Sequence, residues 1–101
     1  MLTERAFESF KEFIETNIAY AKVEYEGVLH KAEIVSRERL PDGRVALSIP
    51  ITPEVSGATT ITKIQLYDIG NKLWAEKTEA IKLKGVQQGV LYRISFNFKE
   101  E

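Results

Sequence analysis

The sequence has no cysteine, which excludes disulfide bonds, thiolate zinc sites and thiol catalysis. It has one histidine, His30, and with so few ligand and base candidates most metal sites and catalytic triads are hard to build. The formal net charge of -1 lacks the basic excess of a general nucleic-acid binder, so we expect no nucleic-acid partner. No apolar run approaches the roughly 20 residues of a membrane span, so no membrane partner is expected either.

Length and composition favour one folded domain. The 101 residues suffice for one hydrophobic core, and 44% hydrophobic against 29% charged residues is the balance of a globular domain. The first five residues include an acid and no apolar core region, so we expect no secretory signal. We predict a single domain over 1–101, with a helix at 1–17, a first set of β-strands at 18–51 and a second set at 61–99.

Residues 1–17 carry the clearest helical pattern. Their apolar side chains fall within a stripe of ~120° on a helix, and these are Ala6, Phe7, Phe10, Phe13 and Ile14. Thr3 is the predicted N-cap and Asn17 the predicted stop. The stripe has two interpretations, a helix that binds a partner or a helix that packs on the protein's own sheet. We favour the second, because an isolated helix of this length is marginal without tertiary packing.

The first strands alternate around short turns. Residues 18–25 and 28–36 form a predicted hairpin around Glu26-Gly27, with Val23 opposite His30 and Lys22 facing Lys31. The Leu40–Gly43 turn leads into a strand that ends near residue 51. The apolar residues of this strand are odd-numbered and pair with odd-numbered residues across the turn, whereas the second strand of the first hairpin buries its even-numbered residues. We therefore predict a bulge or a change of sheet between about residues 35 and 38.

The second strands complete a mainly β fold. We predict a loop at 52–60 and strands at 61–68, 73–77, 81–84 and 90–98, the last of them central because large apolar residues alternate along it. The fold class is therefore mainly β (α+β), with the N-terminal helix packed on an antiparallel β-sandwich or partly open barrel of about six to seven strands.

Few residues carry chemistry. His30 lies on an apolar face in the predicted register, and this favours a structural role over general-base catalysis. Exposed acids on strands are commonplace, and no calcium-loop spacing or glycine-rich phosphate loop occurs. We therefore expect no enzyme activity, no catalytic residue, no metal site and no cofactor.

The aromatic and basic residues of the second half are the interface candidates. Alternation places Trp74 and Tyr67 on the outer face of one hairpin, where they would anchor a protein interface or stack on sugar rings. Trp74 could instead pack beneath a loop or the helix. Lys82, Lys84 and Arg93 fall in a stretch without acids, 82–99, and give a candidate basic surface that could steer copies of the chain or a partner together. The alternative is that they are the solvated charges of an ordinary surface.

Three segments of the C-terminal half resemble small structural proteins of tailed phages and prophages. They are Ile64–Asp68, Leu73–Lys77 and Gly89–Phe98, which form a strand–turn–strand pattern within residues 61–99. The pattern is most similar to tail-fibre and baseplate-associated proteins of phages that infect Gram-positive bacteria. The resemblance implies a non-enzymatic virion component in a multi-copy assembly, located in the virion or in the host cytoplasm during assembly. No functional residue is carried over.

The leading hypothesis is therefore a virion structural or adaptor protein whose partners are other tail proteins or copies of itself. The alternative is a carbohydrate-binding module that uses the exposed aromatics Trp74 and Tyr67 on cell-surface sugars. A third hypothesis is a small hydrolase or isomerase centred on His30.

Overall fold

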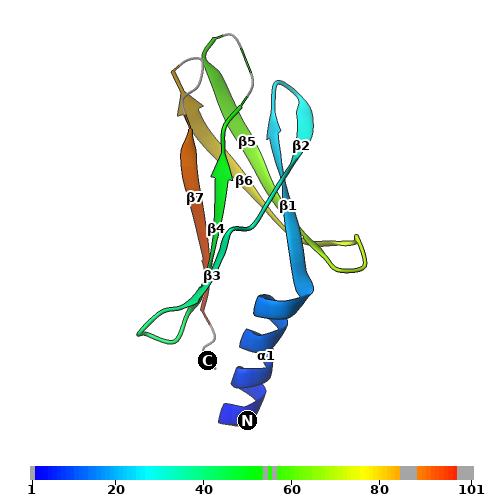
Figure 1. The fold of residues 1–101 in the computed structure, drawn as a ribbon, viewed down its shortest axis with the longest axis vertical. Helices are drawn as coiled ribbons and strands as arrows, with labels where there is room; N and C mark the ends of the chain where they lie inside the picture. The colour runs from blue at the N-terminus through cyan, green and yellow to red at the C-terminus, as the bar shows by residue number, and fades with distance from the viewer. Residues whose placement is uncertain (1, 54, 56, 85–88, 98–101) are drawn as a thin grey trace.

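In the computed structural model, which describes residues 2–53, 55, 57–84 and 89–97, the chain forms one helix and seven strands. In chain order these are α1 (Glu4–Asn17), β1 (Ile18–Tyr25), β2 (Val28–Ala32), β3 (Ser36–Arg39), β4 (Val45–Ile51), β5 (Thr59–Asp68), β6 (Leu73–Leu83) and β7 (Val90–Phe96). One antiparallel sheet has the order β2-β1-β5-β6 and a second has the order β3-β4-β7 (Figure 1). The predicted α+β sandwich with an N-terminal helix is confirmed.

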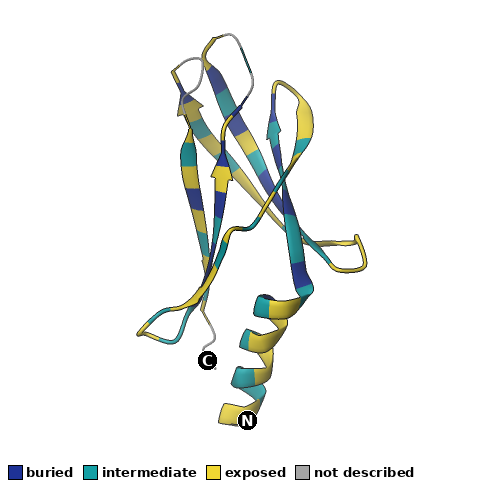
Figure 2. Ribbon diagram, viewed as in Figure 1, coloured by how far each residue is buried: buried dark blue, intermediate teal, exposed yellow. Residues whose placement is uncertain are grey.

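The core lies between the two sheets. Strand side chains alternate between faces, so buried and exposed segments alternate along the strands in Figure 2. Cross-strand pairs such as Val23 with Ile64 and Ala21 with Leu66 place apolar residues of β1 and β5 side by side. The opposing sheet contributes four buried residues of β4, which are Val45, Leu47, Ile49 and Ile51.

Helix α1 begins where the sequence predicts. The Thr3 hydroxyl accepts a hydrogen bond from the Ala6 amide at 3.3 Å, so Thr3 is the N-cap. Asn17 is the last helical residue, and the chain continues directly into β1 at the buried Ile18. The helix therefore projects from one end of the sandwich (Figure 1).

The first hairpin has the predicted register. Val23 faces His30 and Lys22 faces Lys31 across β1 and β2. Its turn has positive φ angles of 55° at Glu26 and 73° at Gly27, as a two-residue type I′ turn requires.

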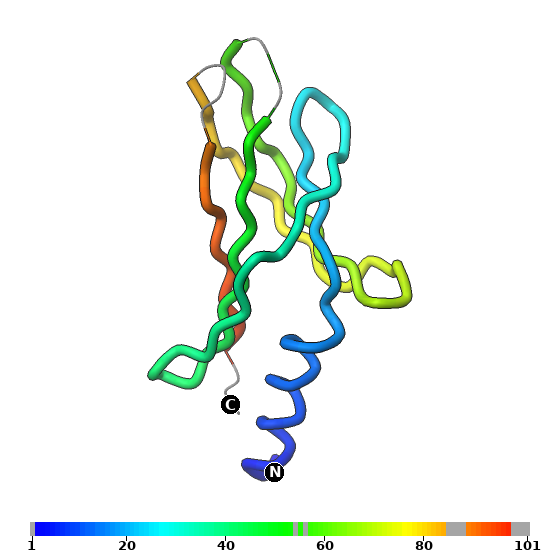
Figure 3. The backbone as a smooth tube through the Cα atoms, in the orientation of Figure 1, coloured from blue at the N-terminus to red at the C-terminus, as the bar shows by residue number. Residues whose placement is uncertain are grey.

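The chain changes sheets between β2 and β3, as the conflict in apolar parity predicts. β2 ends at Ala32 in the four-stranded sheet, and β3 begins at Ser36 in the three-stranded sheet (Figure 3). The Leu40–Gly43 turn then joins β3 to β4, with the Gly43 amide donating to the Leu40 carbonyl at 2.9 Å. The switch lets even-numbered residues of β2 and odd-numbered residues of β4 face one core.

Three other strand predictions are wrong. The segments 73–77 and 81–84 belong to one strand, β6, because register shifts against β5 absorb the break in alternation. The predicted loop at 52–60 ends earlier, since β5 begins at Thr59. β7 is an edge strand instead of a central one, and Tyr92 is its buried residue. Phe98, the last residue of that apolar pattern, lies outside the described residues.

Side chains join the free edges of β6 and β7, between which no backbone ladder runs in the described strands. The Tyr92 hydroxyl of β7 donates to the Glu79 carboxylate of β6 at 2.5 Å. Burial raises the pKa of Tyr92, and the acceptor carboxylate of Glu79 raises it further. This bond ties one edge of each sheet to the other.

Tyr92→Phe tests the contribution of that bond. The substitution keeps the ring and leaves the Glu79 carboxylate without its donor, so we expect a loss of about 1–2 kcal/mol in the free energy of unfolding. Urea denaturation followed by circular dichroism measures the loss. Tyr20→Phe is the matched control, because the Tyr20 hydroxyl donates to Asn71 at an exposed site. Equal losses in the two variants would show that the Tyr92 bond does not hold the sheets together.

Candidate protein-interaction site

An apolar groove lies where α1 meets β6 and β7. It has a volume of about 360 Å³ and is lined by Phe10, Phe13, Ile14, Trp74, Phe96 and Asn97. The Trp74 ring packs between two others, 5.9 Å from the Phe13 centroid and 5.5 Å from the Phe96 centroid. Phe10, Phe13 and Trp74 still leave 44%, 38% and 38% of their surfaces exposed. The described lining carries no charged side chain, so the groove suits an apolar group of a partner.

Two arginines of β3 position the helix beside this groove. Arg39 donates to both oxygens of the Glu15 carboxylate, at 2.9 and 2.8 Å, and to Glu8 at 2.5 Å. Arg37 donates to the carbonyls of Glu15 and Ile18 at the helix C terminus, where carbonyl groups lack partners within the helix. The hydrogen bond from Arg39 lowers the pKa of Glu15. The acidic side of α1 is therefore bound to the protein's own sheet.

These contacts leave part of the apolar stripe open. Ile14 is buried, whereas Phe10 and Phe13 are exposed, and much of α1 is exposed in Figure 2. The expected packing of the stripe on the protein's own sheets is confirmed for Ile14 and for the Phe13 ring, which contacts Trp74, but Phe10 and Phe13 both stay partly exposed. The reason is geometric, because at 100° per residue Glu8 lies about 140° around the helix from Phe13, and Glu15 about 140° from Phe10. Binding Arg39 through the acids turns the phenylalanines away from β3.

The structure separates the two predicted aromatic anchors. Trp74 contacts Phe13 of the helix and Phe96 of the opposing sheet, so it faces the inner side of its own sheet. Tyr67 stacks on Tyr20 on the outer side, with centroids 5.2 Å apart. Of the two orientations left open for Trp74, packing against the helix is the one observed. The outward orientation does not occur because the register of β6 against β5 shifts at this point, where Leu73 pairs with Tyr67 and Ala75 with Leu66. The shared platform that a sugar-stacking site would need is not formed by these two residues.

The outer face of the four-stranded sheet holds a tyrosine–lysine cluster of Tyr20, Tyr67, Lys22 and Lys31 that sequence reasoning missed. The Lys22 ammonium lies 4.6 Å from the Tyr67 ring centroid, and the Lys31 ammonium lies 4.5 Å from that of Tyr20. These cation–π contacts offset the repulsion between the two opposed lysines. The predicted register already placed Lys22 opposite Lys31, and two opposed lysines need a neighbouring group that offsets their repulsion. That pair was the signal in the sequence that could have pointed to the tyrosine rings.

The basic candidates are not brought together. Lys82 and Lys84 lie at the end of β6, whereas Arg93 lies in β7 of the other sheet. Arg93 lies 3.4 Å from Glu38 of β3.

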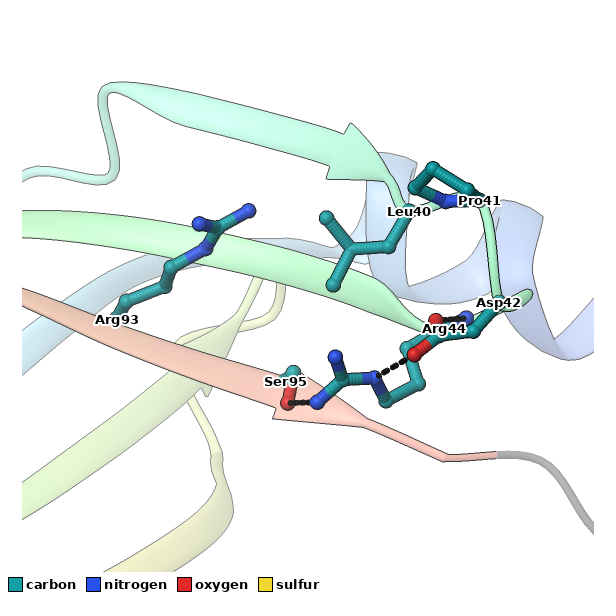
Figure 4. Close-up of a pocket in the computed structure, with 6 residues that line it drawn as sticks. All are labelled: Leu40, Pro41, Asp42, Arg44, Arg93 and Ser95. Carbon is teal, nitrogen blue, oxygen red and sulfur yellow. Dashed lines mark hydrogen bonds and ion pairs between the residues drawn. The ribbon is translucent and has the colours of Figure 1, made fainter.

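Arg93 also lines the shallow pocket of Figure 4, together with Leu40, Pro41, Asp42, Arg44 and Ser95. Arg44 bonds Asp42 at 2.8 Å and Ser95 at 3.2 Å in the same view. Both arginines of this pocket therefore already have partners within the chain.

His30 packs as the register predicts. Its ring stacks on Tyr25 with centroids 3.9 Å apart, and it lines a shallow cavity that also includes Glu33 and Thr52. No described residue hydrogen-bonds to its imidazole, so the nucleophile–base–acid arrangement of a triad is not assembled there. Over the described ranges, no three acidic or histidine side chains gather as a metal site.

Comparison with protein-family models, curated proteins and solved structures finds no match to this chain. Among the described residues no helix is long and apolar enough to cross a membrane. The chain is an α+β sandwich with a partly exposed apolar groove at its helical end.

The Glu15–Arg39 contact predicts a pH dependence of stability. Because the folded-state pKa of Glu15 is lowered, its stabilisation is complete above the unfolded pKa of about 4.3 and is lost as pH falls through the folded value. Wild type should therefore exceed Glu15→Gln in unfolding free energy at pH 6, and the difference should vanish as the solution is acidified. Urea denaturation at several pH values measures this difference. Glu33→Gln, at an exposed position between β2 and β3, is the control, and the same pH-dependent difference there would contradict the assignment.

Proposed function

We propose that this protein is a non-enzymatic structural or adaptor component of a tailed-phage or prophage virion, acting through protein–protein contacts in a multi-copy assembly. The observation that carries the proposal is the apolar groove. Its aromatic walls come from three separate elements, α1, β6 and β7, and are held in place by the contacts of Arg37 and Arg39 with the helix. Aromatic side chains grouped at a surface are typical of protein interfaces.

The resemblance of residues 61–99 supplies the class of assembly. Trp74 lies in one of the resembling segments and Phe96 in another, so two walls of the groove come from the part of the chain that is similar to tail-fibre and baseplate-associated proteins. The partners under this proposal are other tail proteins or copies of the same chain. The protein would act in the virion or in the host cytoplasm during assembly.

Purified tailed particles from the source strain test the proposal. We expect quantitative mass spectrometry to find this chain in such particles at more than one copy per particle. Replacing the gene by a Phe13→Ser variant should lower its incorporation on the order of tenfold, because a polar group replaces an apolar anchor.

Leu91→Ser is the control, since Leu91 is 63% exposed and lies outside the groove. This variant should be incorporated as wild type is. Absence of the chain from the particles would contradict the proposed function, and equal losses in the two variants would show that the groove does not carry it.

A further inference from the structure

Strand β2 is an open edge of the four-stranded sheet. It lies outermost in that sheet, with β1 on its other side (Figure 1). Because the two-residue turn closes the hairpin, the residues of β2 that exchange backbone bonds with β1 are Val28, His30 and Ala32. The amide and carbonyl groups of Leu29 and Lys31 therefore point away from β1. Among the described residues nothing bonds these groups, so they are available to another strand.

The shallow cavity at His30 lies on the inner side of this edge. It has a volume of about 340 Å³, and its walls include the Tyr25–His30 ring stack with Pro50 and Ile51 at the end of β4. Lys31 also lines it although its side chain lies on the outer face, so the cavity borders the backbone edge itself. Alternate side chains of a strand added to β2 would point to this inner side. The rings, the proline and the isoleucine suit an apolar side chain there.

The outer side of the same edge carries two opposed lysines. Lys22 and Lys31 face each other across β1 and β2, and their ammonium groups contact the rings of the tyrosine–lysine cluster. Over the described ranges no carboxylate forms an ion pair with either lysine, and Glu33 lies beyond the end of β2. An added strand would place a side chain directly beside Lys31, where an acid is favoured and a base is not. The β2 strand of a second copy would bring another lysine to this face, so the charge selects a different chain.

We propose that the β2 edge is a docking site for an extended segment of another protein in which apolar and acidic residues alternate. The segment adds to the sheet as one more strand, and its backbone bonds the outward groups of Leu29 and Lys31. Its apolar side chains enter the cavity at His30, and its acids lie beside Lys31 on the outer face. This interaction goes beyond the proposed function, because it uses neither α1 nor the apolar groove.

Amide hydrogen exchange in the full chain, followed by NMR, tests the backbone bonds. The probe is a short capped peptide of alternating valine and glutamate at millimolar concentration. In the free protein the amides of Leu29 and Lys31 should exchange fast and that of His30 slowly, because the His30 amide bonds β1. The peptide should slow exchange at Leu29 and Lys31 by about tenfold and leave His30 unchanged. Exchange at Leu29 and Lys31 that the peptide does not slow overturns the inference.

Charge reversal at the edge tests what selects the partner. Lys31→Glu removes the opposition of two lysines, so the variant is expected to fold. It should bind the valine–glutamate peptide about fivefold more weakly than wild type and bind a valine–lysine peptide more tightly. Lys72→Glu is the matched control, because it makes the same charge change at an exposed position between β5 and β6. Equal effects in the two variants, or a Lys31→Glu variant with the wild-type preference, overturn the inference.

Other modes of peptide binding give different results. An all-glutamate peptide that binds as tightly as the alternating one would show charge attraction without an added strand, and this overturns the inference. Trp74 is the single tryptophan of the chain and lines the apolar groove. A peptide that shifts its emission and leaves exchange at the β2 edge unchanged binds in the groove instead, which also overturns the inference. Both results leave the proposed function standing, because that function is tested by incorporation into particles.

Discussion

Arg37 and Arg39 tie α1 to β3, and the two acids that bind Arg39 decide how the helix is turned about its axis. Glu8 and Glu15 lie on the opposite side of the helix from Phe10 and Phe13. When both acids bind the Arg39 guanidinium of β3, the two phenylalanines therefore point away from β3. Trp74, which also contacts Phe96, then covers Phe13 in part. The groove is the geometric result of this orientation.

Local pattern was enough to predict the helix, the first hairpin and the change of sheet. Thr3 caps α1 by accepting a hydrogen bond from the amide of Ala6, three residues along the chain. The turn at Glu26-Gly27 fixes which residues of β1 and β2 face each other. The buried residues are even-numbered in β2 and odd-numbered in β4, and a change of sheet allows both sets to face the core. The chain makes that change between β2 and β3. Each of these features depends on residues close together in the sequence.

The errors arise where packing between distant segments decides. Alternation alone directs Trp74 outward, but a register shift against β5 and the rings of Phe13 and Phe96 hold it on the inner side. The apolar alternation of β7 suggests a central strand, although the edge position is stabilised by Tyr92 bonding to Glu79 across the gap between sheets. The groove could not be predicted for the same reason, because its helical wall is separated from the other two by roughly sixty to eighty residues of chain.

Edge strands usually offer the easiest route to association, and three of the four edge strands here are blunted. β3 has four residues, three of them charged, and β6 carries two register shifts that disturb a flat ladder. β7 is tied through Tyr92 and Phe96 to side chains of β6. Backbone pairing is therefore discouraged at these three edges, whereas the groove beside Trp74 keeps apolar side chains partly exposed at the surface.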